Sequence, residues 1–226
     1  EIEAGTVDSA AATGKTGTWT PKGNTANASG VITLRTNPAD WTGSAPSGFK
    51  ALCTANLSAP TIPDPSKYFQ VDTFTGTGAE LARVLTDAAG DAVKPDFVWL
   101  KDRDTAVQHV LTDSARGATK ELNSDATAEE TTVAQGVKSF DTSGYTLGTD
   151  GNYNTSSSPN VAWCWNTQGG AGSSNTDGTI NTTTTSVGTT QGMSISTYTG
   201  NGTDPASIGH GLGVTPELVM VKGRST

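Results

Sequence analysis

The chain has 226 residues and carries 22 acidic against 14 basic side chains, so its formal net charge at pH 7 is −8. Hydrophobic residues make up 33% and charged residues 16% of a chain that holds 27 glycines. This composition excludes the charge-rich class of disordered chains and the Leu/Glu/Lys-rich class of helical proteins. Scattered cations do not form the basic stripe that binds nucleic acid, and no apolar run approaches the roughly 20 residues that span a bilayer. We expect neither a nucleic-acid partner nor membrane insertion.

The chain opens at Glu1 without the basic and apolar regions of a secretory signal, so we expect a processed or trimmed product. Its two cysteines, Cys53 and Cys164, lie far apart in the sequence, unlike the dense cysteine framework of small secreted domains. We expect two buried free thiols, and a disulfide is the alternative. His109 and His210 show no metal-ligand spacing with the cysteines, so neither a metal site nor a cofactor is predicted.

An internal repeat divides the chain. Residues 73–78 read TFTGTG and residues 197–202 read TYTGNG, while 95–105 read PDFVWLKDRDT and 216–226 read PELVMVKGRST. Each copy has a Thr/aromatic strand, a Gly turn, a Pro and an apolar strand that ends in Lys-x-Arg. The second copy stops at Thr226, so we expect a truncated second module and a polypeptide that continues.

Four regions follow from the repeat and from composition. Residues 1–66 are predicted to form an extended, proline-studded region. The alternative is that they are the end of an upstream domain. Residues 67–166 form the first β-sandwich module. Residues 167–191 are rich in Gly, Ser, Thr and Asn, so they are predicted to be an exposed linker with a hairpin at Asp177–Gly178. Residues 192–226 start the second module.

Two strands alternate in a distinctive way. Residues 97–100 are a four-residue apolar run, and residues 161–165 alternate tryptophans with small side chains. Because successive side chains of a strand point to opposite faces, each strand has one aromatic face. The side chains on these aromatic faces are Phe97, Trp99, Trp163 and Trp165. We expect the run to be buried on both sides, the rings to hold sheets together, and residues 218–221 to repeat the first strand.

Short strands and frequent turns dominate the rest of the chain. Further strands are predicted at residues 31–35, 68–75, 107–112, 139–140, 145–147 and 193–199. Asp141–Gly144 supplies a turn, and residues 79–93 are expected to form strand plus loop, because their counterpart in the repeat carries a proline and glycines. The acidic stretch 126–135 is the remaining helix candidate. The pattern predicts an all-β fold of tandem β-sandwich or jelly-roll-like modules with extended linkers.

No catalytic pattern stands out. There is no Gly-x-Ser-x-Gly elbow. The carboxylates Asp113, Glu121 and Glu129–Glu130 are available for a glycosidase pair, but adjacent carboxylates on a polar stretch are usually solvated. Residues 150–154 carry oxygen ligands in alternate positions, as calcium loops do, but they lack a closing acidic residue and favour an Asx turn. We therefore predict no catalytic residue and no enzyme.

Aromatic side chains are the remaining binding groups, since exposed rings stack on sugars while polar side chains bond the hydroxyls. Tyr153 lies in a Gly/Asn-rich loop and is predicted to be exposed, whereas Tyr198 matches Phe74 in the repeat and is expected in the core. Arg116 is expected to pair with Asp113 or Glu121, or to line a binding groove. The residues predicted for a binding surface are Tyr145, Asn152, Tyr153, Asn154 and Arg116.

Six segments in order resemble a module of bacteriophage virion proteins, mainly tail-fibre-like proteins of phages that infect aquatic bacteria. They are SGFKALCTANLSAPTI (47–62), KYFQVDTFTGTG (67–78), KPDFVWLKDR (94–103), LTDSARGATKELNSD (111–125), SFDTSGYTLG (139–148) and VAWCWNTQGG (161–170). The resemblance implies a β-rich module, often in tandem, after a concanavalin-A-like or SPRY-like domain that ends with the first segment. It carries no catalytic residue.

What the resemblance implies is a virion structural protein, a tail fibre or fibre-like adhesin, that contacts host-surface glycans and is assembled in the host cytoplasm. Its expected partners are copies of itself in a homotrimer, which would cover strand edges, and other virion proteins. A capsid-decorating or tail accessory protein is the first alternative. A surface-polysaccharide depolymerase is the second.

Overall fold

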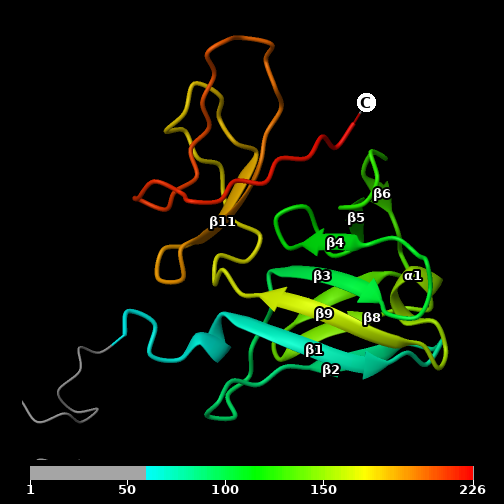
Figure 1. The fold of residues 1–226 in the computed structure, drawn as a ribbon. Helices are drawn as coiled ribbons and strands as arrows, with labels where there is room; N and C mark the ends of the chain where they lie inside the picture. The colour runs from blue at the N-terminus through cyan, green and yellow to red at the C-terminus, as the bar shows by residue number, and fades with distance from the viewer. Residues whose placement is uncertain (1–59, 226) are drawn as a thin grey trace, which may run out of the picture. The chain divides into compact units, whose positions relative to one another are not determined.

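The computed structural model describes residues 60–225, and the chain divides into two units, Glu1–Pro60 and Thr61–Thr226. Figure 1 shows the second unit in colour, and the account below concerns that unit. The predicted strand at 31–35, Cys53 and nearly all of region 1–66 lie outside the described residues. Within the described part, no helix has the length and apolar character needed to cross a membrane.

The fold is all-β, as predicted, with antiparallel pairing between its strands and one helical turn, α1 (Gly151–Asn154). A six-stranded sheet has the order β1-β9-β3-β4-β5-β6, and a three-stranded sheet has the order β2-β8-β7 (Figure 1). The larger sheet contains β1 (Phe69–Thr75), β3 (Phe97–Asp102), β4 (Val110–Asp113), β5 (Lys120–Asn123), β6 (Thr131–Thr132) and β9 (Pro159–Trp165). The smaller sheet contains β2 (Leu81–Val84), β7 (Val137–Asp141) and β8 (Gly144–Leu147), and a separate hairpin pairs β10 (Thr184–Gly188) with β11 (Met193–Thr197). A 3-10 helix at Pro65–Lys67 precedes β1.

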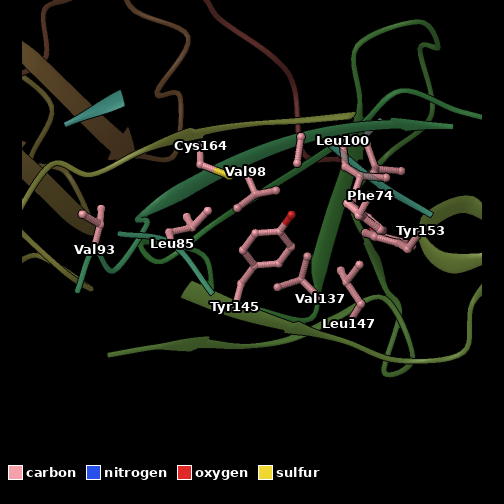
Figure 2. Packing of buried hydrophobic residues seen from close by; sticks show 12 residues of the cluster. Phe74, Leu85, Val93, Val98, Leu100, Val137, Tyr145, Leu147, Tyr153 and Cys164 are labelled. Atoms are coloured by element: carbon pink, nitrogen blue, oxygen red, sulfur yellow. The ribbon is translucent and has the colours of Figure 1, made fainter. Parts of the chain in front are cut away.

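The core lies between the two sheets. The inner face of the larger sheet carries small and aliphatic side chains, because the strand alternation sends the tryptophans of β9 and β3 to the other face. Figure 2 shows Tyr145, Val137 and Leu147 of the smaller sheet packed beneath this inner face. The members of this core are Phe74, Leu85, Val93, Val98, Leu100, Val110, Val137, Tyr145, Leu147, Tyr153, Ala162 and Cys164.

A buried carboxylate ties the two sheets together. Asp72 on the inner face of β1 accepts hydrogen bonds from Arg83 Nε at 2.9 Å and Arg83 Nη2 at 2.7 Å, both from β2. It also accepts one from the hydroxyl of Tyr145 in β8 at 2.9 Å. The Arg83 guanidinium lies 4.7 Å from the centre of the Phe74 ring. These contacts satisfy a charge that burial would otherwise penalise, and they fix the position of one sheet on the other.

The β7–β8 hairpin forms at the predicted turn, with Asp141 paired to Gly144. Gly144 has φ +138°, and a Cβ at this position would lie 1.9 Å from the carbonyl oxygen of Arg83. Only glycine allows β2 to approach β8 this closely. Residues 79–93 form β2 followed by a loop, as predicted, whereas the helix candidate 126–135 holds β6 and no helix.

The strand predicted at 218–221 is wrong. In the sequence repeat Leu218 corresponds to Phe97, the first residue of β3. Phe97 is 8% exposed, and β3 pairs with β9 on one side and β4 on the other, whereas Leu218 is 77% exposed and belongs to no strand. The reason is that an apolar run forms a strand only where partner strands lie beside it, and no described strand pairs with residues 218–221. The two copies of the sequence repeat thus have different surroundings.

Residues 168–181 of the predicted linker contain no buried residue and no named strand, whereas residues 184–188 form β10. Thr167, Thr185 and Ser186 are buried, and their hydroxyls bond one another and their neighbours, for example Thr167 Oγ1 with Ser186 Oγ at 2.7 Å. Hydroxyl pairs therefore replace apolar packing here. The hairpin also differs from the prediction, because β10 and β11 are joined at residues 189–192 rather than at Asp177–Gly178.

We expect Tyr145→Phe to lower the free energy of unfolding by about 1.5 kcal/mol, because it removes one hydrogen bond to a buried carboxylate without leaving a cavity. Urea unfolding of the full chain measures the loss. Tyr198→Phe, at a half-exposed ring with no such partner among the described residues, is the control and should change little. Equal effects of both substitutions would contradict the role of the Tyr145 hydroxyl.

Candidate functional site

The predicted tyrosines lie inside the molecule. Tyr145 is 0% and Tyr153 is 1% exposed, so neither ring can stack on a ligand from solvent. Each hydroxyl has a buried acceptor: the Tyr145 hydroxyl donates to Asp72, and the Tyr153 hydroxyl donates to Glu121 at 2.7 Å. Burial raises the pKa of both phenols above its ordinary value, so both stay protonated donors. The prediction of an exposed Tyr153 is wrong.

The asparagines beside Tyr153 have structural contacts. Asn154 is buried, and its amide nitrogen donates to the carbonyl oxygens of Ala79 and Gly148 while its Oδ1 accepts from the Thr77 amide. Asn152 is half-buried in the turn, where its backbone amide donates to Asp150 Oδ1 at 2.8 Å. This bond is the predicted Asx turn, and it caps α1. Neither amide forms part of an open surface with Tyr153.

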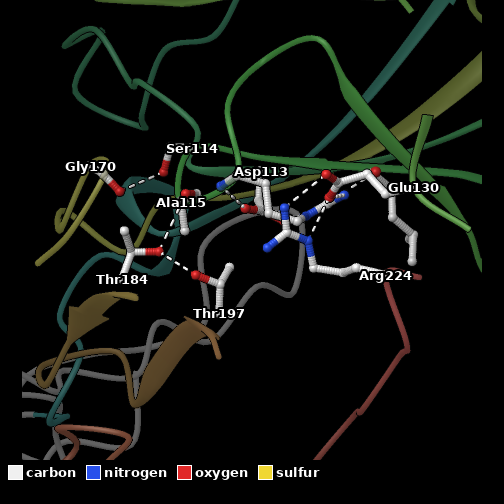
Figure 3. Close-up of polar contacts among 10 residues, drawn as sticks. Asp113, Ser114, Ala115, Glu130, Gly170, Thr184, Thr197 and Arg224 are labelled. Atoms are coloured by element: carbon white, nitrogen blue, oxygen red, sulfur yellow. Dashed lines mark hydrogen bonds and ion pairs between the residues drawn. The ribbon is translucent and has the colours of Figure 1, made fainter. Parts of the chain in front are cut away.

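Arg116 forms the predicted ion pair with Asp113, at 2.6 Å between Nε and Oδ2. The guanidinium is buried, and it also reaches Glu130 at 3.3 Å, which in turn accepts two hydrogen bonds from Arg224, each 2.8 Å long. Figure 3 shows Arg224 and Glu130 joined by these contacts beside Asp113. Burial alone would raise the pKa of Glu130, but Arg224 and Arg116 outweigh it and hold this pKa below its ordinary value.

A polar groove of about 560 Å³ adjoins this cluster. Tyr198 lies in the lining and is 36% exposed, because β11 ends one residue earlier at Thr197. The core position predicted for Tyr198 is therefore wrong. The lining residues are Glu130, Ser196, Thr197, Tyr198, Thr199, Gly200, Val221, Lys222, Gly223, Arg224 and Ser225.

Aromatic side chains gather on the outer face of the six-stranded sheet. The register aligns Val71 of β1, Trp163 of β9 and Trp99 of β3 in one row across three strands. Val71 is 53% exposed and Phe69, in the next row on the same face, is 40% exposed, while both tryptophans are half-buried. We call Phe69, Val71, Trp99, Trp163 and Trp165 the aromatic face.

The rings of the aromatic face contact one another. The Trp99 and Trp163 ring centres are 6.0 Å apart in an edge-on arrangement, and Phe69 lies 5.0 Å from Trp165. Such contacts hold the rings in place before any ligand arrives. Phe97 is in the same row as Phe69 and Trp165, with its ring centre 5.2 Å from that of Trp165, and it is buried. The expectation that these rings hold two sheets together is thus wrong, since the inter-sheet core uses the opposite face.

Of the carboxylates considered for a glycosidase, Glu129 is exposed and the other three have structural partners. Asp113 pairs with Arg116, Glu121 accepts from Tyr153, and Glu130 is held by two arginines. Within residues 60–225, no group of three or more His, Cys, Asp or Glu side chains could hold a metal ion. Cys164 is a buried free thiol whose pKa is raised by burial.

We expect Glu130→Gln to lower the urea midpoint at pH 7 and to lower it less at pH 3 than at pH 7. The folded-state pKa of Glu130 lies below its ordinary 4.5, so its ion pairs stabilise the fold above pH 4.5 and lose this effect as the pH falls through the lowered pKa. Glu129→Gln, at the exposed neighbour, is the control and should have no effect at either pH. A difference between Glu130→Gln and wild type that stays constant with pH would contradict the account.

The comparisons with known proteins give one match. No curated protein and no solved structure matches the chain. Residues 64–226 match a family described as a domain of unknown function, DUF7483, and this match covers both sheets and the β10–β11 hairpin. The chain belongs to the DUF7483 family.

Proposed function

We propose that the chain is a structural module of a bacteriophage virion, a tail fibre or fibre-like adhesin, whose aromatic face contacts glycans of the host surface. The six sequence segments that resemble phage virion modules support the virion role. The observation that supports the binding role is the row of partly exposed rings on the outer face of the larger sheet. The same proposal places the protein in the virion.

The chemistry of the aromatic face fits a sugar. Partly exposed indole rings offer apolar surface for the C–H face of a pyranose, and they lose little conformational entropy because their neighbours already hold them. Thr73 and Thr75 are exposed on the same face of β1, so their hydroxyls can bond sugar hydroxyls beside the rings. A flat sheet face with rings in a row suits an extended oligosaccharide better than a compact ligand.

The same face also supports the first alternative, a capsid-decorating or tail accessory protein, because apolar rings dock onto protein as well as onto sugar. The depolymerase has less support, since Asp113, Glu121 and Glu130 are each held by a structural partner. The fibre proposal includes a homotrimer of this chain that contacts other virion proteins. Measuring the molecular mass of the full chain in solution tests the trimer.

A glycan array probed with the full chain tests the proposal, and titration calorimetry then measures the affinity for the best glycan. We expect Trp163→Ala to weaken binding about tenfold, or about 1.4 kcal/mol, because it removes the central ring of the row. Val84→Ala on β2 is the control, since this valine is 67% exposed on the other sheet and should leave the affinity unchanged.

Two results would contradict the proposal. One is that no glycan binds the wild-type chain, in which case binding to purified virion proteins would favour the accessory role. The other is that Trp163→Ala, shown by circular dichroism to be folded, binds the glycan as tightly as wild type does.

A further inference from the structure

Two buried oxygen atoms at one end of the sandwich have no hydrogen-bond donor. Asp102 ends β3 and is 1% exposed, and Asn160 near the start of β9 is 0% exposed. Within the part of the chain that the structure describes, neither Asp102 Oδ2 nor Asn160 Oδ1 has a hydrogen-bond partner. A buried acceptor without a donor costs roughly 1–3 kcal/mol, so the pair calls for an explanation.

The two oxygens come from neighbouring positions. Asp102 and Asn160 are direct partners in the β3–β9 register, and both side chains point to the inner face, like Leu100 and Ala162 beside them. Partners across antiparallel strands have Cα atoms about 4.5–5.5 Å apart. The side chains therefore start from adjacent points on the same face of the sheet.

The orientation of each group is fixed by its other contacts. The Asn160 amide nitrogen donates to the carbonyl oxygen of Ser158 at 3.0 Å, which directs its Oδ1 away from that carbonyl. Asp102 Oδ1 accepts from the backbone amides of Asp104 and Thr105, which leaves Oδ2 as the open oxygen. Exchanging the oxygen and nitrogen of the Asn160 amide would place its oxygen against the Ser158 carbonyl oxygen, so the exchange does not explain the unpaired Oδ1.

The carboxylate is charged and has no cationic partner. Burial by itself would raise the pKa of Asp102, but hydrogen bonds from the Asp104 and Thr105 amides and from the Ser158 and Thr105 side chains together outweigh it and hold this pKa below its ordinary value. Among residues 60–225, no Lys, Arg or His nitrogen lies within 4.0 Å of its oxygens. The nearby Lys101 ammonium donates instead to the carbonyl oxygens of Asp102 and Thr105. A water molecule could donate to both open oxygens, but unlike a cation it would bring no positive charge to the buried carboxylate.

We propose that Asp102 and Asn160 bind a hard cation, Ca²⁺ or Na⁺, between the end of β3 and the start of β9. Carboxylate and amide oxygens are the ligands that such cations prefer, and backbone carbonyls and water complete their shells. The Ser158 side chain is near enough to the Asp102 carboxylate to share a hydrogen bond that lowers the pKa of Asp102, and its hydroxyl oxygen can instead face a bound cation. A single carboxylate makes a weak site, with a dissociation constant on the order of 0.1–1 mM for Ca²⁺.

Thermal unfolding of the chelator-treated full chain tests this site in CaCl₂, NaCl and choline chloride of equal ionic strength. At roughly 10 mM Ca²⁺ we expect Tm to rise by about 3 °C or more over choline, because the cation binds the folded state alone. If the site prefers Na⁺, NaCl alone gives the rise. Equal Tm values in the three salts would overturn the proposal and leave water as the occupant.

Variants locate the effect. Asp102→Asn should abolish the cation-dependent rise, and Asn160→Asp should enlarge the rise in Ca²⁺ because it adds a second carboxylate. Asp96→Asn is the matched control: Asp96 is as buried as Asp102, but it accepts from Ser114 and Thr167, so its loss should lower Tm in all three salts equally. Loss of the rise in Asp96→Asn, or its persistence in Asp102→Asn, would place the cation elsewhere and overturn the assignment.

Discussion

The contact of Asp72 with Arg83 and Tyr145 is the interaction on which the arrangement of the two sheets depends. It joins β1 of the larger sheet to β2 and β8 of the smaller one, and it lies inside the core among aliphatic side chains. Apolar packing between sheets is non-directional, so it favours contact without fixing one relative position. A buried carboxylate with three well-directed donors allows one position only.

Strand alternation sets the character of the outer face. Asp72 and Phe74 of β1 share the inner face of the larger sheet with the small and aliphatic side chains of β3 and β9, and alternation sends the indole rings of β3 and β9 to the opposite face. They lie on the outer face in a row with Val71, partly open to solvent. The same strand alternation therefore puts Asp102 and Asn160 on the inner face and the aromatic rings on the outer face.

Much of the fold could be predicted from local patterns, because strand alternation and turn residues are local properties. The faces of β3 and β9, the β7–β8 turn and the Asx turn at Asp150 follow from neighbours in the sequence. The site residues depend on distant partners. Tyr145 is buried through Asp72, 73 residues away, and Tyr153 through Glu121, 32 residues away, so the glycines and asparagines beside them predict an exposure that the fold does not allow. The failure of the strand at 218–221 has the same cause, since pairing needs partner strands and no described strand pairs with these residues.

A double-mutant cycle between Asp72→Asn and Arg83→Leu measures the contact between the sheets most directly. Urea unfolding of wild type, the two single variants and the double variant gives the coupling free energy between β1 and β2. The account predicts a coupling of about 1 kcal/mol or more, since both residues belong to one buried network. Additive effects of the two substitutions, with a coupling near zero, would contradict it.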